Sequence, residues 1–287
     1  IEDIVNEINT MNLQGINEVV LTGVHVGGYG SDTGRSLYTL IQAILDDTDL
    51  PRLRLASVEP WDLPENFFDL FTNPRLMPHM HLPIQSGSDT VLKRMARRCK
   101  TAEFAELVTR ARNAVPSFNI TTDIITGFPG ETNAEWQETL EFVTQMNFGH
   151  LHIFPFSARE GTKAARLPDQ IKKTIKQERC RQLADVGEIM KLDNLKKTMA
   201  NQHEVLWEKP ANIADSMRRF TGYTTNYHRV ETEIPAAFDI EYQITPVDIL
   251  NIDETRLILQ GSVKEAFYKA TKLTSRVIPI TPISHVG

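Results

Sequence analysis

The sequence predicts an α/β protein whose parallel sheet is followed by a small all-β domain. Apolar or β-branched runs alternate with helical patterns between residues 17 and 156. From about Asn201 onward, short alternating segments are separated by polar or proline-containing turns. Strands that alternate with helices form a parallel sheet with right-handed crossovers, either doubly wound or closed into a barrel. Short strands without helices between them predict a small β-barrel or sandwich.

The expected elements follow one another along the chain. Strands are expected at 17–23, 52–58, 80–84, 119–127 and 151–156. Helical patterns occur at 37–45, 65–72, 91–95, 102–114 and 134–146. The later strands are expected at 203–207, 220–230, 238–245 and 256–263. Parallel sheets bind ligands at the carboxyl ends of their strands, so the loops after the first five strands are the candidate sites of chemistry.

The segment 121–132 joins a β-branched strand to a helix through a Gly-Phe-Pro-Gly turn. Gly127 and Gly130 permit a backbone geometry and a close ligand approach that a Cβ would block. Thr132 can cap the following helix, and Glu135 can complete a capping box, so the first helical amides could face an anionic group. An ordinary strand-to-helix turn has the same pattern. The segment indicates a cofactor site because similar strand ends recur along the chain.

Composition favours a cytosolic globular protein. The chain has 287 residues, of which 41% are hydrophobic and 24% charged, enough for a full core and two domains. Its apolar runs are too short for a membrane span, and the sequence shows no signal peptide, although it starts at Ile1. Cys99 and Cys180 lie far apart in charged surroundings, which fits reduced thiols and cannot by itself make a metal or cluster site.

Charge separates three regions, which we take as residues 1–165, a connector at 166–198 and residues 199–287. The connector has nine basic and five acidic residues on a long helical pattern, expected to bury Ile175, Leu183, Val186, Ile189 and Leu192. Such a run is usually a solvated helix face, and contact with a polyanion is the alternative.

Two further groups of residues suit nucleic acid. Arg94, Arg97 and Arg98 cluster on the helix after the third strand, where they could contact phosphates. Tyr223, Tyr227 and Arg229 place aromatic rings beside a cation, as on surfaces where bases stack. Packing inside the protein would explain the aromatic residues equally well.

Six motifs occur in a fixed order along the chain. They are Thr-Gly-Val-His-Val-Gly-Gly-Tyr-Gly at 22–30, Ser-Val-Glu-Pro at 57–60, His-Leu-Pro-Ile-Gln-Ser-Gly-Ser-Asp at 81–89, Leu-Lys-Arg-Met at 92–95, the segment 123–132, and Phe-Pro-Phe-Ser-Ala-Arg-Glu-Gly-Thr-Lys-Ala-Ala at 154–165. With these motifs the sequence resembles the radical S-adenosylmethionine (SAM) methylthiotransferases over residues 1 to about 230. The Thr-Gly-Val-His and Ser-Val-Glu-Pro versions are most similar to the branch that modifies N6-threonylcarbamoyladenosine in transfer RNA (tRNA).

The resemblance implies a fold and a reaction. It implies a partial TIM-type barrel that lacks its first strand, followed by an RNA-binding TRAM-like domain. The family binds SAM on a [4Fe-4S] cluster, uses a second cluster, and inserts a methylthio group at C2 of an adenosine beside the anticodon. Cluster chemistry of this kind requires three thiolates and an open iron site, where SAM is reduced to a 5′-deoxyadenosyl radical. An electron donor such as a flavodoxin or ferredoxin is the further implied partner.

The sequence departs from the family in one respect, because it contains no Cys-x-x-x-Cys-x-x-Cys motif. In the family that motif lies on the loop after the first barrel strand, and Ile1 would fall in the helix just after it. The resemblance therefore implies a fragment without the first strand, its cluster loop and the N-terminal cluster domain. We expect this chain alone to be inactive, without catalytic residues or metal ligands of its own.

The resemblance assigns residues to SAM and to RNA. Gly23, His25 and Tyr29 match the segment near the methionine part of SAM, and Gln85, Ser86 and Gly127 match the sugar and adenine contacts. The SAM set also includes Asp123 and Glu59, the latter as a hydrogen-bond acceptor for the ribose or the substrate base. The expected RNA contacts are Arg94, Arg97, Arg98, Arg159, Tyr223, Tyr227 and Arg229. Arg159 would suit the carboxylate of the threonyl group, because guanidinium pairs with carboxylate in two hydrogen bonds.

Three alternatives remain. The substrate could be that of the isopentenyladenosine or the ribosomal-protein branch. The chain could also be an RNA-binding remnant without catalysis. Finally, His79 with His81, and His150 with His152, each point to one side of a strand, as in metal-dependent hydrolases with a TIM barrel. Such a site needs further ligands on later strands, and His79 stands at the beginning of its strand, the wrong end for chemistry.

Overall fold

The computed structural model of the chain describes residues 1–199, 202–214 and 216–270. It contains five parallel strands, β1 (Glu18–Leu21), β2 (Arg52–Leu55), β3 (His79–His81), β4 (Asn119–Thr126) and β5 (His150–Pro155). The α-helices are α1 (Glu2–Leu13), α2 (Leu37–Asp47), α3 (Asp89–Arg94), α4 (Thr101–Ala114), α5 (Asn133–Met146) and α6 (Lys173–Thr198). The α/β class with parallel strands is confirmed. Within the described residues, no helix combines the length and the apolarity needed to cross a membrane.

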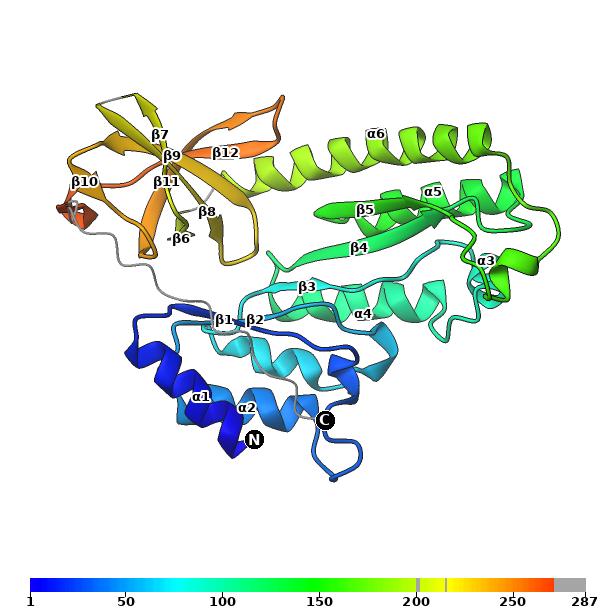
Figure 1. The fold of residues 1–287 in the computed structure, drawn as a ribbon, viewed down its shortest axis with the longest axis horizontal. Helices are drawn as coiled ribbons and strands as arrows, with labels where there is room; N and C mark the ends of the chain where they lie inside the picture. The colour runs from blue at the N-terminus through cyan, green and yellow to red at the C-terminus, as the bar shows by residue number, and fades with distance from the viewer. Residues whose placement is uncertain (200–201, 215, 271–287) are drawn as a thin grey trace.

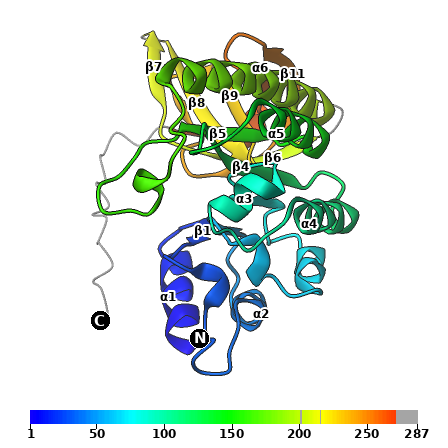
Figure 2. The same ribbon diagram turned by 90° about the vertical axis from the view of Figure 1, so that its right-hand side faces the viewer.

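The parallel strands are neighbours in chain order. β1 pairs with β2, and β4 pairs with β3 on one side and β5 on the other, all in parallel. Two isolated parallel bridges, Leu53 with Leu76 and Ser57 with His81, connect β2 to the β3 side. The succession therefore runs from β1 to β5 without a reversal. Figure 2 shows α1 and α2 near β1 at one end of this succession, and α5 and α6 near β5 at the other.

Alternation along the strands separates an apolar face from a polar one. Leu53, Leu55, Met80, Ile120 and Ile124 are at most 1% exposed and pack with the helices in one core. The helices begin as their sequences predict. Ser36 with Thr39 forms a capping box for α2, and Thr132 with Glu135 forms the expected one for α5. The predicted helix at 65–72 is instead a 3-10 helix, η3 (Phe67–Thr72), whose phenylalanines are buried.

The remaining 3-10 helices are η1 (Val26–Gly28), η2 (Pro60–Asp62), η4 (Ala164–Arg166) and η5 (Glu265–Phe267). The second part of the chain forms β6 (His203–Trp207), β7 (Ala211–Ala214), β8 (Met217–Thr224), β9 (Arg229–Pro235), β10 (Phe238–Asp239), β11 (Ile244–Asp253), β12 (Ile258–Ser262) and β13 (Lys269–Ala270). Six of these strands pair in the order β6-β11-β12-β9-β8-β7, and β6 also pairs with β8. This closed pairing around Trp207 and Phe220 is an all-β domain with its own core.

Two strand predictions in this domain were wrong, and one strand was not predicted. The segment 220–230 is not one strand but the end of β8, a turn and the start of β9, with Tyr227 at φ 69° in the turn. Gly222 lies inside β8, where a Cβ would come within 2.3 Å of the Leu206 carbonyl oxygen. The segment 238–245 contains only the short β10 and the first residues of β11, and β7 was not predicted.

α6 connects the two cores. Leu183 and Met190 pack in the core of the parallel sheet, whereas Leu195 belongs to the core of the β domain. Figure 1 shows α6 running beside β5 and ending at the β domain. The predicted buried face is wrong in part, because Ile175 is 41% and Ile189 71% exposed. Helix α6 is thus packed on both domains rather than solvated all round.

The β8–β9 hairpin is fixed to the polar face of the parallel sheet by hydrogen bonds. Arg52, 1% exposed, donates to the carbonyl oxygens of Tyr223 at 3.1 Å and Glu204 at 2.9 Å. Its neighbour Arg54 forms two hydrogen bonds of 3.1 Å with the carboxylate of Glu18. Arg54 also donates to the carbonyl oxygen of Thr225 in the β domain at 3.3 Å. Burial, partly offset by the charge of Glu18, lowers the pKa of Arg52 to about 10. Two buried guanidinium groups therefore hold the two domains together.

We expect Arg52→Ala to lower the free energy of unfolding by about 3 to 5 kcal/mol, because it leaves two buried carbonyl groups and part of the Glu18 charge without a partner. Urea unfolding followed by circular dichroism measures this change. Arg219→Ala is the matched control, because Arg219 pairs with Glu233 at the surface, and its loss should cost less than about 1 kcal/mol. Equal effects of both substitutions would contradict the role given to Arg52.

Candidate functional site

The polar face of the parallel sheet lines a cavity, and all five strands contribute to it. Alternate residues of a strand share a face, so each strand offers its side chains at intervals of two. The polar residues from the strands are Glu18, Arg54, His79, His81, Asn119, Thr121, His150 and His152. Because the helices cover the other face, this polar face is where the sheet can bind a ligand.

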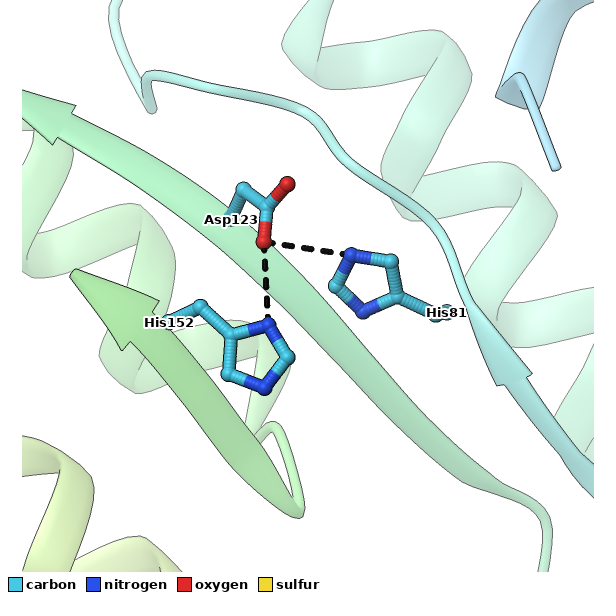
Figure 3. A group of neighbouring side chains, drawn as sticks. All are labelled: His81, Asp123 and His152. Carbon is cyan, nitrogen blue, oxygen red and sulfur yellow. Dashed lines mark hydrogen bonds and ion pairs between the residues drawn. The ribbon is translucent and has the colours of Figure 1, made fainter. Parts of the chain in front are cut away.

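Three side chains from adjacent strands converge above this cavity. The Oδ1 atom of Asp123 on β4 lies 3.1 Å from Nε2 of His81 on β3 and 3.1 Å from Nδ1 of His152 on β5 (Figure 3). On the other side of the His81 ring, Nδ1 lies 2.9 Å from the hydroxyl of Thr121. This second contact orients the imidazole toward Asp123. We call His81, Asp123 and His152 the triad.

The triad favours an ionised carboxylate. Burial alone would raise the pKa of Asp123, but hydrogen bonds and charge interactions with His81 and His152 outweigh burial and lower the pKa. Two imidazoles and one carboxylate whose ligand atoms lie within 4.8 Å of one another are donors that divalent transition metals accept. The same groups can hydrogen-bond the edge of a nucleobase.

The sequence analysis singled out all three residues of the triad but did not predict that their side chains contact one another. Asp123 was assigned to SAM, and the histidines were noted only as two pairs. The strand register is what brings them together, because Asp123 lies opposite His152 and Thr121 opposite His81. His79 does not join the triad. It is buried, with its ring 4.5 Å from that of Tyr227.

A second group lies at the carboxyl ends of β1 and β2. Nδ1 of His25 is 3.5 Å from Oε2 of Glu59 and 3.6 Å from Oδ2 of Asp62. Both carboxylate oxygens are buried and have no hydrogen-bond partner among the residues that the structure describes. Burial raises the pKa of Asp62. The structure thus unites His25 with Glu59 as two assigned residues, and adds Asp62, which sequence reasoning missed.

The other residues assigned to SAM lie in varied surroundings. Gly23 is exposed, whereas Tyr29 packs against the core. Gln85 follows β3 with φ 80°, and its backbone pairs with β4. Ser86 is fully buried, and its hydroxyl contacts that of Thr139 at 3.3 Å.

Gly127 is the clearest departure from expectation. It has φ 69°, as a turn glycine should, but a Cβ there would lie 2.3 Å from Cγ of Lys176 on α6. Its N–H donates to Glu131 at 2.7 Å. The close approach predicted for a ligand is therefore made by a lysine side chain, and the geometry does not support a ligand contact by the hydroxyl of Ser86 or by Gly127.

Comparison with known proteins shows which family the chain resembles. Residues 1–143 match the radical SAM superfamily. Threonylcarbamoyladenosine tRNA methylthiotransferase MtaB of Bacillus subtilis is 35% identical over 237 residues, which cover 80% of this chain and 51% of that protein. MtaB of Thermotoga maritima is 41% identical over 203 residues, 70% of this chain and 47% of that protein. The chain belongs to the radical SAM superfamily.

Other relatives carry a different name. The tRNA-2-methylthio-N(6)-dimethylallyladenosine synthase of Malacoplasma penetrans is 36% identical over 214 residues, 73% of this chain and 44% of that protein. The chain spans about half the length of these curated relatives. Among solved structures, the radical SAM enzyme coproporphyrinogen III oxidase of Escherichia coli has the same fold, with a TM-score of 0.52 and 12% identity over 78% of this chain and 59% of that one.

Radical SAM proteins use SAM and a [4Fe-4S] cluster. The cysteines of this chain do not form a cluster site. Cys99 is buried, with its pKa raised to about 11 by burial, and Cys180 lies 3.0 Å from the hydroxyl of Thr126. A cluster needs three thiolates, and the sequence has two cysteines. The carboxylate oxygens of Glu59 and Asp62, in contrast, have the chemistry to accept hydrogen bonds from ammonium and hydroxyl groups, which SAM offers.

Of the arginines assigned to RNA outside the β domain, one is paired with a carboxylate of the described residues and three are not. Arg94 forms two hydrogen bonds, of 2.9 and 2.8 Å, with Glu135, so its guanidinium is already neutralised. Arg97, Arg98 and Arg159 are exposed, and the structure gives them no ion pair within the described residues. Arg94 is therefore not supported as a phosphate contact.

The rings of the two tyrosines stack on each other. The ring of Tyr227 stacks 4.5 Å from His79 and 4.6 Å from Tyr223, and Arg54 lies 4.7 Å from its centroid. Stacking on a base requires a free ring face. The geometry does not support Tyr227 as a base-stacking residue, although it lines the cavity together with Tyr223 and Arg229.

We expect the fold to lose stability as the pH falls from about 6.5 toward 4. Burial, with Arg54 as the next cause, keeps the pKa of His79 well below the usual value. Burial, His203 and Lys191 lower the pKa of His228 to about 4. Below about pH 6.5 these histidines therefore bind protons in the unfolded chain but not in the folded chain, which favours unfolding.

Melting temperatures between pH 7.5 and 4.5 measure this effect. His228→Gln removes one such group and should reduce the drop in melting temperature across the window. Gln14→Ala provides the control, because it replaces an exposed side chain that does not titrate and should leave the drop as in the unchanged protein. An identical pH dependence in the His228 variant would contradict the expectation.

Proposed function

We propose that the whole protein is a tRNA methylthiotransferase that uses radical SAM chemistry to add a methylthio group at C2 of N6-threonylcarbamoyladenosine. The observation that carries the proposal is the match of most of the chain to two MtaB proteins, at 35 and 41% identity. The two motifs in 22–30 and 57–60 favour the same branch. As the chain spans about half of these relatives, the proposal concerns the whole protein.

The fold is consistent with this reaction. We take the parallel sheet as a partial TIM-type barrel, because its strands follow one another in chain order with helices outside. We take the all-β domain as a TRAM-like RNA-binding domain. The polar face would then be the inside of the barrel, and the carboxyl ends of its strands would face SAM.

Four residues are proposed as SAM contacts on their geometry. Glu59, with its neighbour Asp62, offers the unpartnered acceptors described above. His25 stands beside both and can orient them. Asp123 presents a carboxylate to the inside of the barrel. When bound, the cluster supplies the electron that cleaves SAM, and a small redox protein such as a flavodoxin or ferredoxin is the proposed source of that electron.

The tRNA is proposed to contact the exposed cations. Arg97 and Arg98 follow α3, at the rim on the carboxyl side of the sheet, and Arg159 lies in the loop after β5. These side chains have no acidic partner within ion-pair distance in the part of the chain that the structure describes, so their charge is available to phosphates. Electrostatic contacts of this kind position the RNA without reading its sequence.

A second substrate, dimethylallyladenosine, is favoured by the similarity to the dimethylallyladenosine synthase, which is 36% identical over 214 residues.

In a strain that lacks the gene for the protein described here, we expect tRNA hydrolysates to lose the methylthio form of threonylcarbamoyladenosine and to retain the unmethylthiolated form. Mass spectrometry of nucleosides measures both. Loss of methylthio-dimethylallyladenosine instead would transfer the protein to the other branch, and an unchanged profile would overturn the proposed function.

We expect the double variant Arg97→Ala and Arg98→Ala to bind tRNA more weakly and with less dependence on salt. For every arginine–phosphate interaction that the substitutions remove, the slope of log affinity against log salt should become shallower by about 0.7 to 0.9. Filter binding at four salt concentrations measures the slope. Arg35→Ala removes an exposed arginine outside the cluster and should leave the slope unchanged. A double variant with an unaltered slope would exclude the cluster from the RNA interface.

A further inference from the structure

A cavity of about 550 Å³ lies between the polar face, α6 and the β8–β9 hairpin. The sheet contributes His150 and Thr121, α6 contributes Lys191, and the hairpin contributes Tyr223 and Arg229. This volume is in the range of sites for small organic ligands. In Figure 1, α6, β5 and β8 lie near one another around this region. The cavity therefore exists only because the two domains are joined.

The cavity has positive charge that the protein does not neutralise. Among the described residues that line it, the one acid is Glu18, which is bound to Arg54 at 3.1 Å. Lys191 and Arg229 have no carboxylate within ion-pair distance in the described part of the chain. Glu188, one turn from Lys191, acts on its charge only from beyond that distance. Two cations thus face one cavity without a counter-ion.

One histidine of the cavity, His150, lies close enough to Lys191 for the charge of the lysine to act on it. Burial, followed by the charge of Lys191, lowers the pKa of His150 to about 4. Burial lowers the pKa of Lys191 itself, and repulsion by Arg229 adds to this effect. A bound anion would relieve this repulsion, and its attraction to the two cations would be stronger in the partly buried cavity than in bulk water.

We propose that Lys191 and Arg229 bind the carboxylate on the N6 substituent of the substrate adenosine, while the ring of Tyr223 and the imidazole of His150 contact the base. This inference rests on the proposed function and names the residues that read its substrate. Arg159, which the sequence suggested for this task, is exposed on a loop and is not among the residues of the cavity. A dimethylallyl group has no charge and would gain nothing from the two cations.

The test compares anticodon stem-loop RNAs that differ only at the target adenosine. The adenosine is unmodified, carries a threonylcarbamoyl group or carries a dimethylallyl group, and binding to the whole protein is measured by fluorescence anisotropy. We expect the unchanged protein to bind the threonylcarbamoyl RNA roughly tenfold or more tightly than the unmodified RNA, as one charge-assisted contact allows. Lys191→Met and Arg229→Met should each reduce this ratio toward one.

Two further variants serve as controls. Lys191→Arg keeps the positive charge and should retain most of the ratio, which excludes a general loss of folding as the cause. Lys196 lies on the same helix and is exposed, with Glu254 at 4.0 Å, so Lys196→Met should leave the ratio unchanged.

The outcomes separate this inference from the proposed function. An equal loss of affinity for all three RNAs in Lys191→Met would mean that the cations contact a phosphate, and an unaltered ratio would mean that they contact no part of the substituent. Either result overturns the inference and leaves the proposed function standing. A preference of the unchanged protein for the dimethylallyl RNA, or no binding of any stem-loop, overturns the proposed substrate and the inference together.

Discussion

The buried guanidinium groups of Arg52 and Arg54 are the constraint on which the arrangement of the two domains depends. A buried charge is tolerated only when it is paired and hydrogen-bonded. Strand β1 supplies one partner, the carboxylate of Glu18. The β domain supplies the others, which are the backbone carbonyl groups of Tyr223, Glu204 and Thr225. Separation of the domains would leave both arginines short of acceptors. The interface is therefore specific in register and not merely apolar.

That interface also creates the site. The β8–β9 hairpin closes one end of the polar face, and α6 closes its side because its residues belong to both cores. Lys191 on α6 and Arg229 on β9 come from different elements, and only the docked arrangement brings them to one cavity. Within the described residues, the chain thus uses hydrogen-bonded cations to fix the domains and leaves two cations without a carboxylate partner where a ligand can bind.

The sequence predicted what depends on local pattern. The five parallel strands, the capping box at Thr132 and the all-β second part follow from alternation and composition. The sequence could not show what depends on distant partners. Tyr227 adopts φ 69° in a hairpin turn, and Ile189 remains 71% exposed on a helix, because contacts outweigh local preference at both positions. The triad likewise arises from the register of three strands, which no single strand encodes.

The two ends of the polar face differ in charge, and this difference orders the proposed reaction. At the carboxyl ends, Glu59 and Asp62 provide acceptors that make no hydrogen bond within the described residues, and these acceptors suit the ammonium and hydroxyl groups of the SAM proposed to bind there. At the opposite end, Lys191 and Arg229 suit an anionic substituent. The triad lies between them, with Asp123 ionised by its two imidazoles. A nucleoside whose carboxylate points to the cations would lie with its base against Tyr223 and His150 and its reactive edge toward the triad and SAM, because the reverse orientation would place its carboxylate against Glu59 and Asp62.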